Sequence, residues 1–101
     1  MPAYVIVDIK VTDPDIYAQY RELAPAIVKA FGGEYIARGG KTQVFEGSVS
    51  PNRTVILKFA SLARAREWVD SPEYRDARKL RHKSTVSTMF VVEGLDETSP
   101  V

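Results

Sequence analysis

Two arginines set close to aromatic residues are the side chains in this sequence best suited to binding a small molecule. Arg38 stands directly before Gly39 and Gly40 in the stretch EYIARGGKTQVFEG, where a glycine bend would redirect its side chain. Arg81 follows Tyr74 by seven residues, about two helical turns, so both side chains can face the same way. A guanidinium group binds a carboxylate through two parallel hydrogen bonds, so these arginines together predict an anion site. A surface arginine paired with a nearby glutamate is the competing interpretation of Arg38.

Aromatic residues would supply the apolar walls of that site. Tyr20 has the helical phase to face a sheet, and Trp68 and Tyr74 flank a helix break at Ser71 and Pro72. Packing in a core or a subunit interface is the more common role of such side chains. The predicted ligand-binding residues are Arg38, Tyr20, Trp68, Tyr74 and Arg81.

His82 is the only histidine and the candidate for acid–base catalysis, because an unperturbed imidazole pKa of ~6.5 lies near neutrality. With one histidine and no cysteine, a single subunit lacks the residues for a multi-histidine metal or haem site or a thiolate site. We therefore expect no metal and no cofactor. The basic segment RDARKLRHK, residues 75–83, is most simply a solvated helix face.

The glycine pair of the first stretch has three interpretations. A phosphate loop requires a helix directly after the glycines, whereas KTQVF, residues 41–45, has the pattern of a strand. A two-residue hairpin turn remains an alternative. We favour a bend or bulge within one long second strand, with Gly39 or Gly40 at a positive φ angle.

Length and charge limit the classes of partner. With 101 residues the chain forms one domain, and a formal net charge of +1 does not indicate nucleic-acid binding. The beginning MPAYVIVDIK has no basic leader pattern, and its apolar run is too short to cross a bilayer. We expect a cytoplasmic protein that binds neither membranes nor nucleic acids.

The remaining patterns predict alternating strands and helices. Residues 3–11, 54–60 and 85–94 alternate or are rich in β-branched residues, as strands are. Asp13 and Pro14 begin a helix that Gly32 and Gly33 end, and Pro25 predicts a kink or short break inside it. Two further helical segments follow Ser61 and Ser71, the second running to about residue 82.

This order predicts an α+β fold, a ferredoxin-like plait with βαββαβ order: a four-stranded antiparallel sheet with helices on one face. It assigns residues 1–95 to the domain and residues 96–101 to a polar tail. The uncovered face would expose Tyr4, Ile6, Ile56 and either Met89 or Phe90, so we predict a homodimer that pairs these faces. Asp8 on the same face would need a partner such as an arginine if buried, or would reach water at the strand end.

Several segments together resemble one uncharacterised family: AYVIVDIKVTDPDIYAQY, FGGEYIARGG, VFEG, WVDSPEYRDARKLR and VVEG. Over nearly the whole chain the sequence is similar to the family called domain of unknown function 1330. The resemblance implies a dimeric α/β barrel, an architecture shared with small monooxygenases, lactone isomerases and haem proteins, and it implies no assigned reaction. The family often has an aspartate just before its last strand, where this chain has Thr85, Val86 and Ser87.

Two classes of function remain open. One is an enzyme, or an enzyme-like protein, whose pocket between sheet and helices takes a small anionic or aromatic metabolite. The other is a non-catalytic ligand-binding or structural homodimer. Fold analogy does not choose between them, because such barrels carry unrelated activities.

Overall fold

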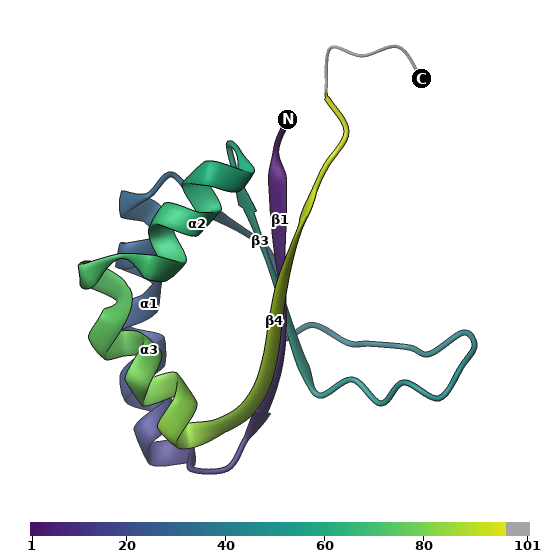
Figure 1. The fold of residues 1–101 in the computed structure, drawn as a ribbon. Helices are drawn as coiled ribbons and strands as arrows, with labels where there is room; N and C mark the ends of the chain where they lie inside the picture. Colours follow the sequence, from purple (N-terminus) through teal and green to yellow (C-terminus); the bar gives the residue numbers. More distant parts are fainter. Residues whose placement is uncertain (97–101) are drawn as a thin grey trace.

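Within residues 1–96, helices cover one face of a single sheet, and the other face has no helix against it (Figure 1). The structure is a computed structural model and describes residues 1–96. The elements are β1 (Ala3–Val11), α1 (Pro14–Ala30), β2 (Glu34–Arg38), β3 (Arg53–Phe59), α2 (Leu62–Asp70), α3 (Pro72–Ser84) and β4 (Thr85–Glu93). The strands lie in the order β2-β3-β1-β4, and all neighbours are antiparallel. The predicted ferredoxin-like fold is confirmed.

The two faces of the sheet follow from the alternation along β1. Val5, Val7 and Ile9 point to the helices and are buried, whereas Tyr4 and Ile6 lie on the open face. The buried set packs with apolar residues of α1, α2 and α3 into one core. The expected division of β1 between a covered and an open face is therefore present.

Helix α1 begins and ends where the sequence predicts. The side chain of Asp13 accepts a hydrogen bond from the Ile16 amide (3.2 Å), and Pro14 takes the first helical position. Gly32 adopts φ +75° after the last turn, and the Gly33 amide donates to the Val28 carbonyl (2.9 Å). The helix is continuous through Pro25, so the short break that we allowed for there does not occur.

Ser71 separates α2 from α3 by serving both helices. Its hydroxyl donates to the Trp68 carbonyl at the end of α2 (2.8 Å) and accepts from the Tyr74 amide in the first turn of α3 (3.1 Å). The two helices are thus joined at one residue. Helix α3 then runs to Ser84, two residues beyond the predicted end, and passes directly into β4.

The prediction of one long second strand is wrong. Strand β2 ends at Arg38, and residues 39–52 form an extended arm without regular strand or helix. The arm stands out on the side of the sheet away from the helices (Figure 1). Its last residues are tied to β1, because Asp8 accepts hydrogen bonds from the Asn52 amide (2.7 Å) and side chain (2.9 Å). Asp8 therefore has an asparagine as its partner and not an arginine.

Gly39 does have the expected positive φ angle, +74°. It ends β2 where we expected a bend within a longer strand, and its amide donates to the Thr54 carbonyl of β3 (2.8 Å). A register shift does occur in β2, but it lies between Tyr35 and Ala37. The bulge residue is Ile36.

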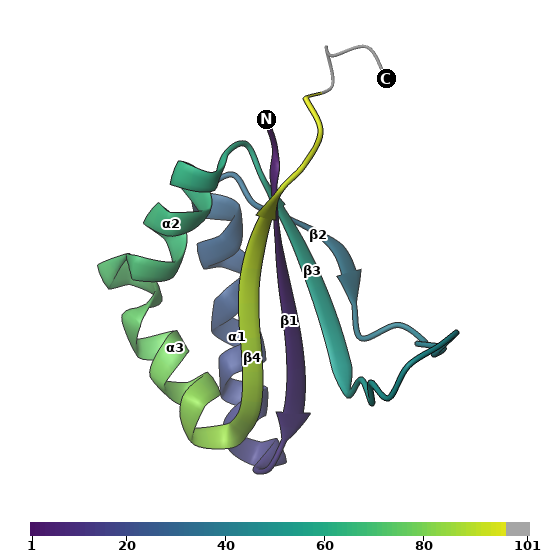
Figure 2. The same ribbon diagram turned by 45° about the vertical axis from the view of Figure 1, so that its right-hand side comes forward.

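The open face presents an apolar row across the sheet. Ile6 of β1 lies opposite Ile56 of β3 on one side and opposite Phe90 of β4 on the other. Phe90 is 60% exposed, and Val92, beside Tyr4, is also exposed. Of the two candidates for the open face in β4, Phe90 is the one found there, and Met89 packs against the core. Figure 2 shows the sheet with all helices on the opposite side.

No helix within residues 1–96 is long and apolar enough to cross a membrane. The tail predicted for residues 96–101 lies outside the described residues except for Asp96.

Candidate ligand-binding site

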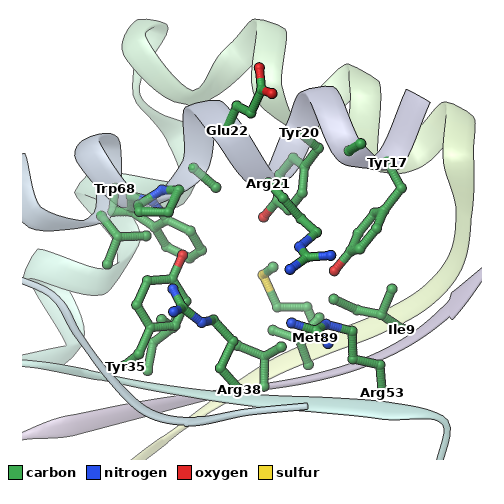
Figure 3. Close-up of a pocket in the computed structure, with 17 residues that line it drawn as sticks. Ile9, Tyr17, Tyr20, Arg21, Glu22, Tyr35, Arg38, Arg53, Trp68 and Met89 are labelled. Carbon is green, nitrogen blue, oxygen red and sulfur yellow. The ribbon is translucent and has the colours of Figure 1, made fainter. Parts of the chain in front are cut away.

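A cavity of about 460 Å³ lies between α1 and the sheet. Side chains of all four strands, including Met89 of β4, form its floor, α1 forms its roof, and Trp68 of α2 closes one side (Figure 3). The polar groups in its wall are mostly arginine and tyrosine side chains. Those most relevant to binding are Tyr17, Tyr20, Arg21, Tyr35, Arg38 and Arg53.

The bulge in β2 aims Arg38 into this cavity. In a regular strand, residues three apart point to opposite faces. Because Ile36 is an extra residue in the pairing, Tyr35 lies opposite Leu57 and Arg38 opposite Val55, and both partners are buried beneath the helices. The Arg38 guanidinium lies over the Tyr35 ring, 4.6 Å from its centroid.

Two arginines in the wall were not predicted. Arg21 lies one helical turn after Tyr17 on α1, and Arg53 precedes Val55 and Leu57 on the same face of β3. Both signals are present in the sequence: an (i, i+4) pair with Tyr17, and the strand alternation continued back to residue 53. In Figure 3 the Arg21 and Arg53 side chains and the Tyr17 hydroxyl point into the space between α1 and the sheet.

The cavity wall carries more positive than negative charge, with three arginines and one glutamate. Within residues 1–96, none of the three cavity arginines has a carboxylate within 4 Å. Glu22 is the acidic residue in the wall, and its side chain points away from the arginines (Figure 3). The buried Nε atom of Arg53 has no hydrogen-bond partner in the described part of the chain. Arg21 and Arg38 are exposed and Arg53 is half-buried, so water solvates these charges in part. The excess of positive charge around the cavity still favours an anion.

Gly39 makes room for Arg53. A Cβ atom at position 39 would come within 2.7 Å of the Arg53 guanidinium carbon, too close for any real contact. The glycine therefore contributes to the site by admitting a cavity arginine. It makes no phosphate loop, because the arm and not a helix follows it.

A cluster of aromatic rings in mutual contact forms the wall around and behind Tyr20. The Tyr20 and Tyr74 hydroxyls are 2.7 Å apart, and Tyr74 is fully buried between Tyr20 and Trp68. The rings of Tyr17 and Tyr20 stack at 5.7 Å, and those of Trp68 and Tyr74 lie 4.5 Å apart. The indole Nε1 of Trp68 is buried and has no hydrogen-bond partner among residues 1–96. Tyr20 and Trp68 line the cavity, whereas Tyr74 supports them from behind.

Burial keeps the wall tyrosines protonated. Desolvation, followed by the neighbouring Tyr74, raises the pKa of Tyr20 far above its usual value. Desolvation also raises the pKa of Tyr35, against the opposing effect of the Arg38 charge. Both hydroxyls are therefore hydrogen-bond donors at neutral pH and not bases.

Arg81 does not join Arg38, contrary to our prediction of one shared anion-binding end. It lines a second cavity of about 380 Å³ between β4 and the α2 and α3 helices, together with His82. Arg81 is 3% exposed, and its Nη1 donates to the Ser87 hydroxyl (2.6 Å). Tyr74 and Arg81 both lie on the buried face of α3, as their spacing predicted. Two helical turns separate them, however, so Arg81 lies at a different cavity.

His82 also lies away from the arginine cavity. Its Nε2 atom is 3.3 Å from Nη2 of Arg81, and its ring is exposed. Desolvation and the charges of Arg81 and Arg78 lower the pKa of His82. The imidazole is therefore neutral at pH 7. In the part of the chain that the structure describes, no group of three or more His, Cys, Asp or Glu residues is placed to hold a metal ion.

Comparison with protein families settles the relationship that the sequence suggested. The family described as domain of unknown function (DUF1330) matches residues 2–95. The chain belongs to this family. No curated protein matches this DUF1330 chain.

Solved structures with the same fold cover nearly all of this DUF1330 chain. A protein of unknown function from Rhodopseudomonas palustris, RPA0582, is 19% identical with a TM-score of 0.75, covering 94% of this chain and 83% of its own. A dimeric ferredoxin-like protein of unknown function from Jannaschia sp. CCS1 is 12% identical with a TM-score of 0.74, covering 93% of this chain and 100% of its own. SnoaB, a cofactor-independent oxygenase from Streptomyces nogalater, is 10% identical with a TM-score of 0.67 and covers 98% of each chain.

These likenesses establish the fold. At such identities the same fold carries different activities, and the site of this DUF1330 protein has to be argued from its own residues.

Proposed function

We propose that this protein is a homodimer, joined through the open sheet faces, in which each subunit binds a small organic anion in the cavity between α1 and the sheet. The ligand carries a carboxylate or similar acidic group on a flat, apolar body. The observation that carries this proposal is a set of three arginines, Arg21, Arg38 and Arg53, that have no carboxylate partner within residues 1–96. The rest of the wall is mostly aromatic and aliphatic, with Glu22 turned away from the arginines.

The electrostatics favour an anion over a neutral ligand. Three like charges around one cavity repel each other, and an anion placed among them offsets that repulsion. The guanidinium groups provide paired donors for a carboxylate, while the rings of Tyr17, Tyr20 and Tyr35 provide flat surfaces. A cavity of about 460 Å³ lies within the usual size range of small-molecule sites.

The geometry of the cavity supports a ligand-binding role more directly than a catalytic one. Tyr20 and Tyr35 stay protonated, and His82 lies in the other cavity, so no base faces the arginines from among these groups. A proton transfer by His82 would require a ligand seated beside Arg81. An enzyme remains the alternative, and the cofactor-independent oxygenase with the same fold supports only the capacity of such a barrel to hold a reacting molecule.

Binding of 2-naphthoate, compared with neutral 2-naphthamide, tests the proposal. We expect naphthoate to bind measurably tighter in calorimetry and to change the fluorescence of Trp68 in the cavity wall. Arg21→Met, Arg38→Met and Arg53→Met should each weaken naphthoate binding about 10- to 100-fold, the usual effect of losing a charge-assisted hydrogen bond.

Arg64→Met is the matched control, because Arg64 lies on α2 outside the cavity and pairs with Glu67 at 2.6 Å. It should leave naphthoate binding unchanged. Equal affinity for the acid and the amide, or an equal loss in the Arg64 variant, would contradict the anion site. Melting temperatures separate loss of binding from loss of fold.

A further inference from the structure

The Tyr20 and Tyr74 hydroxyls form a hydrogen-bonded pair in which one residue is fully buried and the other lines a cavity. They lie 2.7 Å apart, and neither has another hydrogen-bond partner among residues 1–96. Tyr74 is 0% exposed, whereas Tyr20 lines the arginine cavity. Two hydroxyl protons are present, and the shared bond uses one of them.

The position of the second proton follows from burial. If Tyr20 donated to Tyr74, the remaining proton would belong to the fully buried Tyr74, where no acceptor is in reach. An unpaired buried donor is unfavourable, because it has lost its hydrogen bond to water. If Tyr74 donates to Tyr20, the remaining proton belongs to Tyr20 and can meet water or a ligand in the cavity. The second arrangement is the stable one.

Three contacts prepare Tyr20 to donate in a fixed direction. Its oxygen accepts from Tyr74, which polarises its own O–H bond and makes it a stronger donor. Its ring is held by Tyr17 on one side and by the edge contact with Tyr74 on the other. Burial also raises its pKa, so the group keeps its proton throughout the pH range of ordinary assays. A hydroxyl held in this way is suited to recognising an acceptor atom.

We infer that Tyr20 donates this hydrogen bond to the ligand, so that the preferred anion has a second feature besides its acidic group: a carbonyl or ether oxygen on its apolar body. The inference rests on the proposed function, since it places the ligand in the arginine cavity. It narrows the ligand class to aromatic or similarly flat acids that carry an uncharged acceptor oxygen. A site built around a hydrogen bond discriminates against a ligand that lacks its partner, because the protein donor is then left unpaired.

Matched pairs of naphthoates test the inference. Each 2-naphthoate carries one acetyl group at a given ring position, and its partner carries an isopropenyl group there, which has the same shape but no acceptor oxygen. We expect at least one acetyl compound to bind about three- to tenfold tighter than its partner, the usual range for one net hydrogen bond. Tyr20→Phe should abolish that preference, while Tyr4→Phe, which removes a tyrosine hydroxyl on the open face outside the cavity, should keep the ratio.

A double variant guards against a folding defect. Tyr20→Phe alone leaves the Tyr74 hydroxyl buried without a partner, whereas Tyr20→Phe combined with Tyr74→Phe removes both hydroxyls and leaves no unpaired donor. The double variant should fold and bind plain 2-naphthoate with no acetyl preference.

Each other outcome overturns the inference in a recognisable way. If 2-naphthoate binds but no acetyl compound exceeds its partner, the role of Tyr20 is wrong and the anion site stands. If the preference survives in the double variant, another group makes the bond. If no naphthoate binds, the proposed function fails and the inference fails with it.

Discussion

Gly39 affects the site through the space that it leaves for a neighbouring side chain. Gly39 has φ +74°, and the space where its Cβ would stand is filled by the Arg53 guanidinium. Arg53 in turn lines the cavity beside Arg38. Gly39 has no functional side chain, but its missing Cβ leaves the space that the Arg53 guanidinium occupies.

Replacing Gly39 by alanine should therefore affect both stability and binding. The positive φ angle alone costs about 1 kcal/mol for a residue with a Cβ, and the clash forces Arg53 to move. We expect a lower free energy of unfolding in urea and weaker binding of 2-naphthoate. Gly40→Ala is the matched control, since a Cβ there meets nothing within 4 Å and Gly40 has no positive φ. Equal effects at the two positions would show that Gly39 is not special.

At the scale of the elements, the sequence predicted what depends on local signals. The caps at Asp13 and Ser71 and the alternation of β1 can be read from neighbouring residues, and these elements are correct. The end of β2 was misread, because KTQVF has a strand pattern but finds no strand to pair with. Whether a segment pairs as a strand depends on its neighbours in the sheet and cannot be read from the segment alone.

The candidate site was predictable to the same degree. Tyr20 was placed at the cavity from helical phase, Trp68 and Tyr74 from the helix break between them, and Arg38 from a suspected strand irregularity. Tyr20, Trp68 and Arg38 line the cavity, whereas Tyr74 lies behind it. Arg81 was placed wrongly, because helical phase gives the direction of a side chain but not its distance along the groove. The bulge at Ile36 could not be located, since its cause is the register of β2 against β3 and no residue type marks it.

That register makes a prediction about deletions in β2. Removing Ile36 takes out the residue that has no partner in β3, so Tyr35, Ala37 and Arg38 keep their places opposite Leu57, Ile56 and Val55. We expect this variant to fold and to bind 2-naphthoate within a few-fold of the wild type.

Removing both Ile36 and Ala37 shifts the alternation by one residue and turns Arg38 to the open face. Naphthoate binding should then fall to the level of Arg38→Met. If the single deletion loses binding to the same extent, the bulge itself, and not the phase it produces, is what the site requires.

At the scale of the whole molecule, residues 1–96 leave one face of the sheet without a covering helix. The row Ile56, Ile6 and Phe90 crosses three strands, and Phe90 is 60% exposed. The arm stands on the same side and carries Phe45, 89% exposed, and Val49, 68% exposed (Figure 1). Exposed apolar patches on a sheet are typical of interfaces, and in the proposed homodimer a second copy of the sheet about a two-fold axis would cover this face.

A charge at the centre of that face should therefore separate the subunits. In the isolated subunit Ile56 lies on the open face, so an aspartate there would stay in contact with water. In the homodimer, the aspartates of both subunits would be buried without a partner. We expect Ile56→Asp to weaken association by at least about 3 kcal/mol, more than a hundredfold in Kd, in sedimentation equilibrium.

Leu23→Asp is the control, because Leu23 is 46% exposed on α1, on the helical side of the molecule, and should leave association unchanged. A wild-type protein that sediments as a folded monomer at micromolar concentration would refute the dimer outright. An Ile56→Asp variant that remains fully dimeric would place the interface elsewhere. Because the arginine cavity lies on the covered side of the sheet, a folded Ile56→Asp monomer should still bind 2-naphthoate, so the same variant separates assembly from binding.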